Sequence, residues 1–100
     1  MKIFLIAYDL KKVGKNYNEL YSEIKSLGDW HHPLESTWFV AIPQPFVTAD
    51  DVCQKLRLVI DENDNIVVFD VTSRDRQGWA PKSLWGWLKK KESRNHQLHP

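Results

Sequence analysis

Asp9 is the residue whose type and position suggest chemistry most directly. It ends an apolar run that begins at Met1 and has the pattern of a central strand. A carboxylate at such a strand end is a potential magnesium ligand, because Mg²⁺ is usually held by one or two carboxylates with water and phosphate oxygens. The same carboxylate can instead cap a loop or form an ion pair. The functional interpretation needs a second acidic ligand, which a symmetric dimer would supply by bringing two copies of Asp9 together.

A second candidate for metal binding is the acidic stretch that begins at Asp61. The pattern Asp61-x-Asn63-x-Asn65 imitates the start of a calcium loop. However, Ile66 stands where that loop needs glycine, and Thr72 stands where it needs glutamate. A turn, in which Asn and Asp tolerate left-handed backbone, is the better interpretation.

Histidine and cysteine give no strong metal or nucleophile pattern. His31 and His32 are neighbours, so on a strand they point to opposite faces and are unsuited to one zinc ion. Cys53 is the single cysteine and adjoins an apolar helical stripe, where packing is its expected role. It cannot form an internal disulfide, which agrees with a reducing compartment.

The length and composition of the chain are typical of one globular domain. One hundred residues, 42% apolar and 27% charged, make a small domain that a partner subunit would help to stabilise, so we expect a homo-oligomer. Five tryptophans are many for this length and need burial or a partner. No apolar run reaches the roughly 20 residues that a bilayer requires, and the first residues lack a cleavage site. We therefore expect a soluble, cytoplasmic protein with no membrane partner.

Charge is unevenly distributed along the chain although the net charge is only +1. Residues 1–73 hold seven Lys or Arg against eleven Asp or Glu, a balance of −4. Residues 74–100 hold seven against two, a balance of +5. The basic C-terminal quarter is either a solvated tail or an electrostatic surface for nucleic acid.

The spacing of apolar residues predicts the order strand, helix, strand, strand, helix, strand. The predicted elements are a strand over 1–10, a helix over 17–27 with Asn16 as N-cap and Gly28 as its stop, a short edge strand containing Pro33, a strand over 36–42, a helix capped at Thr48, and a buried strand over 66–71. A short helix over 83–90 follows, and residues 91–100 are expected to be a disordered tail.

This order predicts an α+β fold. It is the ferredoxin-like βαββαβ sandwich, in which the first and third strands lie in the middle of an antiparallel sheet. We therefore expect one ferredoxin-like domain over 1–90, with a C-terminal extension.

Several of these segments also resemble a known family. They are Tyr8-Asp9-Leu10, the helix ending in Leu27-Gly28, the run from Trp30 to Trp38, and the segment from Asn65 to Gly78-Trp79. Together they resemble the SinR-like family, which is similar in turn to the small ferredoxin-fold subunit of the CRISPR adaptation complex and to virulence-associated protein D. The resemblance covers residues 1 to about 90, and its most distinctive piece is Leu34-x-Ser36-Thr37-Trp38.

The resemblance implies a homodimer whose sheets face each other and whose C-terminal segment can add to the partner's sheet. In the CRISPR and virulence-associated relatives, the aspartate that ends the first strand is the proposed divalent-metal ligand of a nuclease, and Asp9 occupies that place. In the CRISPR complex the dimer serves mainly as a nucleic-acid-binding bridge. This sequence departs from the CRISPR pattern, because lysines 11, 12 and 15 stand where an arginine is expected.

The leading hypothesis is therefore a CRISPR-associated homodimer that binds RNA or DNA in antiviral defence. It includes magnesium-dependent endonuclease activity, with Asp9 as both the catalytic residue and the metal ligand. The polar and basic side chains expected to contact nucleic acid are Lys11, Lys12, Lys15, Ser36, Thr37, Arg74 and Arg76.

The alternative hypothesis is a non-catalytic dimeric scaffold, or a regulatory module such as one half of a toxin and antitoxin pair. In this interpretation the C-terminal tryptophans form the interface with a partner or the other protomer. The predicted interface residues are Trp79, Trp85 and Trp87.

Overall fold

The structure is a computed structural model that describes residues 1–11 and 17–97, with side chains described as far as residue 93. The elements are β1 (Lys2–Asp9), α1 (Asn18–Leu27), β2 (Asp29–Leu34), β3 (Thr37–Ile42), α2 (Ala49–Arg57), β4 (Asn65–Asp70) and α3 (Lys82–Gln97). The predicted order of strands and helices is confirmed.

The four strands form one antiparallel sheet in the order β2-β3-β1-β4. The first and third strands lie in the middle, so the ferredoxin-like α+β prediction is also confirmed. β2 is an edge strand, as Pro33 indicated, because proline cannot donate to a central ladder. Among the described helices, none is long and apolar enough to cross a bilayer.

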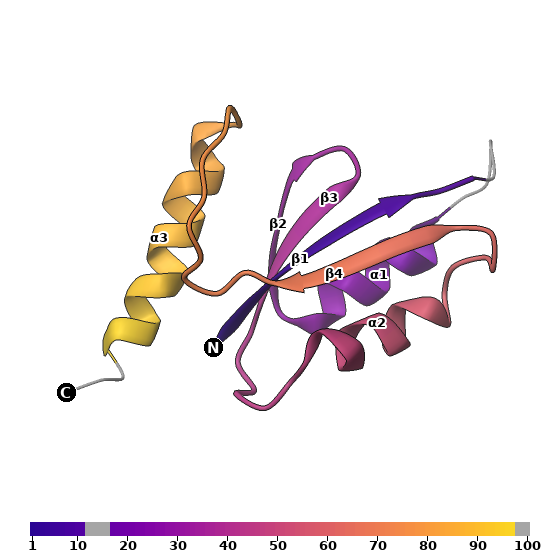
Figure 1. Cartoon of the computed structure of the whole chain (residues 1–100), viewed down its shortest axis with the longest axis horizontal. Coiled ribbons are helices and arrows are strands. Elements are labelled where there is room, and N and C mark those ends of the chain that lie inside the picture. Colours follow the sequence, from indigo (N-terminus) through magenta and orange to yellow (C-terminus); the bar gives the residue numbers. More distant parts are fainter. Residues whose placement is uncertain (12–16, 98–100) are drawn as a thin grey trace.

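One face of the sheet packs against α1 and α2, which lie side by side beneath it (Figure 1). Alternate residues of β1, namely Phe4, Ile6 and Tyr8, point into this layer and are buried there. Leu20 of α1 and Leu56 of α2 are fully buried against them. The strand that the sequence predicted as central is therefore the middle of the main core.

The other face of the sheet is only partly covered. Helix α3 packs on one end of it, where Leu84 and Leu88 bury Ile3 and Ala41 in a second cluster. The remainder carries apolar side chains that are half-buried or exposed, and we call it the open face. It comprises Leu5, Ala7, Phe39, Val67 and Phe69, which the register places on adjacent strands.

β4 does not fit the prediction of a buried strand. It is an edge strand, and Val67 and Phe69 are 50% and 60% exposed. The β-branched and aromatic run was correctly assigned to a strand, but such a run does not tell whether both faces are covered. Here only the face with Ile66 and Val68 packs against the core.

Short sequence patterns predicted where the helices α1 and α2 begin or end. Thr48 and Asp51 form both hydrogen bonds of a capping box at the start of α2, as predicted. α1 has Tyr17 at its N-cap position, while Asn16, the predicted cap, lies outside the described residues. Gly28 ends α1 as expected, but its backbone is extended. A Cβ there would lie 2.2 Å from the carbonyl oxygen of Ala41, so the close approach of β3 requires glycine.

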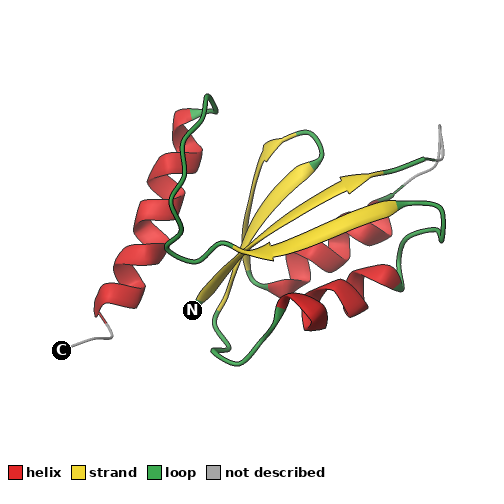
Figure 2. Ribbon diagram, viewed as in Figure 1, coloured by secondary structure: helices red, strands yellow, loops and turns green. Residues whose placement is uncertain are grey.

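α3 is longer than predicted. It begins at Lys82 and runs to Gln97, so residues 91–97, predicted to belong to a disordered tail, continue the helix, and residues 98–100 lie outside the described part. Lys91 is buried in the helix and pairs with Asp29 of β2, a tertiary contact that the helical spacing of apolar residues does not reveal. The loop that leaves β4 runs alongside this helix before α3 begins (Figure 2).

Candidate functional site

The carboxylate of Asp9 lies at the end of β1, as predicted, and is 65% exposed. It forms an ion pair with Lys11, two residues on. The carbonyl of Ser36 accepts a hydrogen bond from the N–H of Tyr8 over 3.1 Å. The structure therefore brings three predicted site residues, Asp9, Lys11 and Ser36, to one end of the sheet. Lys12 and Lys15 lie outside the described residues.

Asp64 holds this end of the sheet in place, and sequence reasoning did not identify it. Its buried carboxylate accepts hydrogen bonds from the Lys11 N–H at 2.8 Å, the Tyr17 hydroxyl at 3.2 Å and the Asp61 N–H at 2.9 Å. One side chain thus joins the segment after β1, the start of α1 and the turn before β4. The Asn- and Asp-rich composition indicated a turn, but not which acid is turned inward.

A magnesium site does not form at Asp9 within one protomer. No group of three His, Cys, Asp or Glu side chains in the described part of the chain is arranged to hold a metal ion. Asp9 offers one carboxylate, and Lys11 already neutralises it. A single carboxylate beside an ammonium group does not fit the ligand set that Mg²⁺ requires.

Five other predicted site residues share one groove. It lies between the open face, the loop after β4 and α3, and has a volume of about 340 Å³. The predicted residues that line it are Thr37, Arg74, Arg76, Trp79 and Trp85. They come from positions 37 to 85, so the fold alone brings them together.

The exposed groups in this groove include the indole of Trp79, the guanidinium of Arg74 and the carboxylate of Asp75. Trp79 is 99% exposed, and Arg74 is exposed without an ion pair to a described residue. Arg76, in contrast, forms a bidentate pair with Glu92 at 2.5 and 2.7 Å. The hydrogen bond to Glu92 raises the pKa of Arg76 and ties its charge to α3. Among the described residues, Arg74 is therefore the groove guanidinium without a salt bridge, and Arg76 holds the loop to α3.

Trp87 lies outside the groove and fastens α3 to β2. Its ring stacks on His31 with centroids 5.8 Å apart, and the Lys91 ammonium lies 5.8 Å from the same ring. His32 stacks on Trp38 on the opposite face, at 3.8 Å. The two histidines thus point to opposite faces, as predicted from their adjacency.

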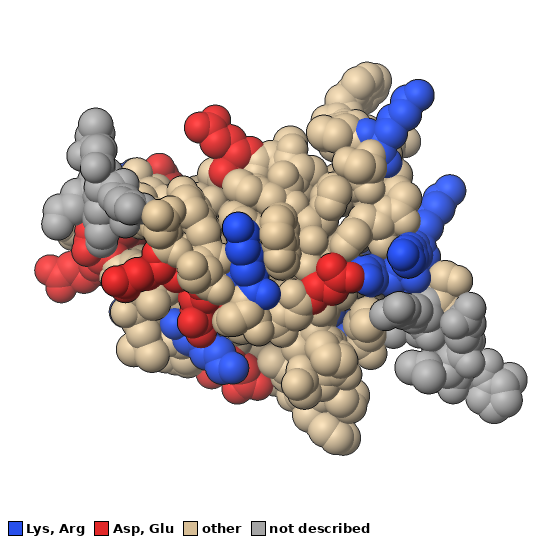
Figure 3. All heavy atoms as spheres, turned by 180° about the vertical axis from the view of Figure 1, so that it is seen from behind, with Lys and Arg blue, Asp and Glu red and all other residues tan. Residues whose placement is uncertain are grey.

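The individual lysines that form a basic surface on α3 were not identified from the sequence. Lys82, Lys89 and Lys90 are exposed, whereas Leu84 and Leu88 face the sheet. Lys and Arg gather toward the end of the molecule that carries α3, and Asp and Glu toward the opposite end (Figure 3). The charge imbalance of residues 74–100 was the available signal, but assigning a helix face required the length and packing of α3.

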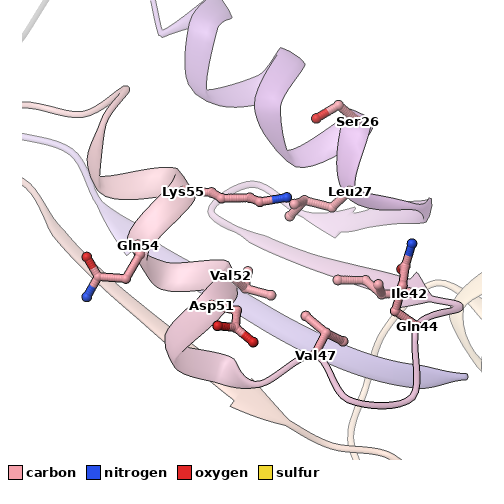
Figure 4. A pocket seen from close by; sticks show the side chains of 9 residues that line it. All are labelled: Ser26, Leu27, Ile42, Gln44, Val47, Asp51, Val52, Gln54 and Lys55. Carbon is pink, nitrogen blue, oxygen red and sulfur yellow. The ribbon is translucent and has the colours of Figure 1, made fainter.

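A hollow larger than the groove beside α3 lies between the ends of α1 and α2 (Figure 4). It has a volume of about 510 Å³ and contains none of the predicted site residues. Its carboxylate, Asp51, is engaged in capping α2, and the hydrogen bonds from Thr48 lower the pKa of Asp51. Lys55 is the one cation among its lining residues. This arrangement offers no paired acid and base for chemistry.

Comparison with models of known protein families finds no match, and neither does comparison with curated proteins. Among solved structures, the hypothetical protein TT1823 from Thermus thermophilus is similar, with a TM-score of 0.55 and 18% sequence identity. The similarity covers 80% of this chain and 94% of that one. At this identity it supports the fold alone.

Proposed function

We propose that this protein binds single-stranded RNA or DNA in the groove beside α3. The observation that carries the proposal is the fully exposed indole of Trp79, which shares the groove with the exposed guanidinium of Arg74. An exposed indole offers a ring face on which a partner can stack, and the groove places a cation on the same surface.

The chemistry of these groups matches the two parts of a nucleotide. Bases stack on aromatic rings without regard to sequence, and Arg or Lys side chains neutralise phosphates. Lys82, Lys89 and Lys90 extend the positive surface away from the groove along α3. A strand whose bases contact Trp79 would have its phosphates near these lysines.

The sequence resemblance supports the same class of partner. The CRISPR adaptation subunit, to which the SinR-like family is similar, binds nucleic acid as a homodimer, and we include a homodimer and a role in antiviral defence in the proposal. The alternative, a scaffold or regulatory module, uses Trp79 as an anchor for a protein partner instead. Both functions use the same groove, so a binding experiment separates them.

The experiment measures fluorescence anisotropy of labelled single-stranded RNA and DNA with the wild type, Trp79→Ala and Phe46→Ala. Phe46 is a matched control, because it is also highly exposed but does not line the groove. We expect Trp79→Ala to weaken affinity by about 1–3 kcal/mol, roughly five- to a hundredfold, and Phe46→Ala to have little effect. Equal affinities for all three proteins, or no binding to either nucleic acid, would contradict the proposal and favour the scaffold.

Magnesium-dependent hydrolysis is a second candidate function. It is favoured by the position of Asp9, which continues the alternation of the open face at the end of β1. Since one copy of Asp9 does not form a metal site, this activity requires a dimer in which the open faces meet and two copies come together. Asp9 would then be the metal ligand, and Mg²⁺ would supply Lewis-acid chemistry to a bound phosphodiester.

A further inference from the structure

The two edges of the sheet differ in how well they are protected from pairing with another chain. β2 contains Pro33, its register with β3 shifts between His31 and Leu34, and α3 packs beside it. Proline, irregular register and a covering helix are the usual means of protecting an edge strand. The edge formed by β2 is therefore closed to strand addition.

The edge formed by β4 has none of these features. Its register with β1 is regular from Asn65 to Asp70, and Ile66, Val67, Val68 and Phe69 form an uninterrupted apolar run. Among the described residues, no strand pairs with its outer side. The one charged residue of β4, Asp70, stands at its end, and a regular edge strand with exposed apolar side chains is a template for pairing with another strand.

The backbone of β4 shows which of its N–H and C=O groups point away from β1. The N–H of Val71 donates to the carbonyl of Ile3 over 2.9 Å, so odd-numbered residues of this segment face β1. Because alternate residues of an antiparallel strand direct their N–H and C=O groups to opposite sides, Ile66, Val68 and Asp70 direct theirs outward. These outward groups would be satisfied by an added strand.

We propose that β4 pairs antiparallel with β4 of a second copy about a two-fold axis at Val68, so that two sheets become one of eight strands. The resemblance implies a different homodimer, with facing sheets and an added C-terminal segment. In this structure residues 82–97 form α3, and Lys91 and Trp87 bind that helix to its own sheet. The C-terminal segment is thus engaged, and the strand available for this edge is β4 itself.

The sequence of β4 is self-complementary in this register. Val67 of each copy lies opposite Phe69 of the other copy. These two residues are the most exposed apolar side chains of the strand, and the pairing brings them into contact. Ile66 lies opposite Asp70, so no charge faces a like charge. A register centred on Val67 is less favourable, because it would put Asp70 opposite Asp64 and Phe69 opposite Asn65. Registers centred beyond Val68 pair fewer residues of the strand.

This dimer does not depend on nucleic-acid binding, and it differs from the dimer that a shared magnesium site would need. Asp9 is paired with Asn65, at the far end of β4 from the axis. Strand spacings put the two copies of Asp9 about 25 Å apart, too far to share one metal ion. No residue of β4 itself lines the groove beside α3, so nucleic-acid binding and edge pairing can succeed or fail separately.

Disulfide trapping tests the proposal in a Cys53→Ser background, which removes the one native thiol. Val68→Cys puts the two cysteines directly opposite, with Cα atoms about 5.5 Å apart, within the range of a disulfide. Ile66→Cys is the matched control on the same face of the strand, because its two copies lie about 13 Å apart along the strand. Val67→Cys tests the neighbouring register.

We expect mild oxidation to give a covalent dimer with Val68→Cys at least tenfold faster than with Ile66→Cys or Val67→Cys. Equal trapping at all three positions, or trapping at Val67 alone, would overturn the proposal. Sedimentation of Val67→Lys supplies a second measurement, because this half-exposed residue tolerates lysine in the folded protomer and the charge would face Phe69. A wild-type dimer that becomes a folded monomer on this change supports edge pairing, and an unchanged assembly contradicts it.

Discussion

The indole N–H of Trp38 donates a hydrogen bond to the hydroxyl of Tyr8 over 2.9 Å, joining β3 to β1 in the core. The Tyr8 hydroxyl in turn donates to the carbonyl of Glu35 at 3.4 Å, in the turn that leads into β3. One hydroxyl therefore connects two central strands and a turn at the end of the sheet that carries Asp9. This position gives the tyrosine a measurable role in stability.

Tyr8→Phe should destabilise the fold by about 1–3 kcal/mol, because it leaves the Trp38 N–H buried without a partner. The loss is measurable as a lower urea midpoint with an unchanged denaturant slope.

The same variant tests a pH dependence. Burial raises the pKa of Tyr8 above its ordinary value of about 10, more than the Trp38 hydrogen bond lowers it. Since the folded state favours the neutral phenol, this contribution is present below pH 10 and is lost as the pH rises above it. The wild type should therefore lose more stability than Tyr8→Phe between about pH 9 and 11. Parallel losses would show that Tyr8 does not titrate as inferred.

Asp9→Asn should abolish any magnesium-dependent cleavage while leaving nucleic-acid affinity within about twofold. The asparagine removes the charge that a metal ion needs but keeps the shape of the side chain. The measurement is cleavage of labelled RNA and DNA with Mg²⁺ and with EDTA. Asp50→Asn at the start of α2 is the control, since it removes an exposed acid beyond the opposite end of the sheet. Cleavage that persists in Asp9→Asn would exclude this aspartate as the catalytic residue.

The combined variant Lys82→Gln, Lys89→Gln and Lys90→Gln should reduce the salt dependence of nucleic-acid binding. Each phosphate contact contributes roughly 0.7–0.9 to the slope of log affinity against log salt, so three contacts should lower it by about 2–3. The control is Lys55→Gln with Arg57→Gln, which removes exposed cations from α2. If both variants change the slope equally, the lysines of α3 have no special role.

Local patterns were sufficient where a contact lies within a few residues. The Thr48 and Asp51 capping box, the strand ending at Asp9 and the edge position of the Pro33 strand all follow from short-range chemistry, and the structure agrees with each. The opposite orientation of His31 and His32 follows in the same way from strand geometry.

The errors concern long-range contacts. The β-branched run over 66–71 was expected to be buried, yet its outer side has no covering element in the described chain. The tail after Lys90 was expected to be disordered, yet Lys91 pairs with Asp29, 62 positions earlier in the sequence.

The sequence alone thus determined the order of the elements, the ferredoxin-like arrangement and the position of Asp9 at a strand end, because periodicity and capping are local properties. Only the tertiary structure decided that Asp64 turns inward to hold that end, and that Trp79 shares a groove with Arg74. It also left the outer edge of β4 without a partner among the described strands. These outcomes depend on which surfaces of the sheet the helices cover. The open face is built from β1, β3 and β4 together, so no single segment of the sequence shows that α3 covers only one end of it.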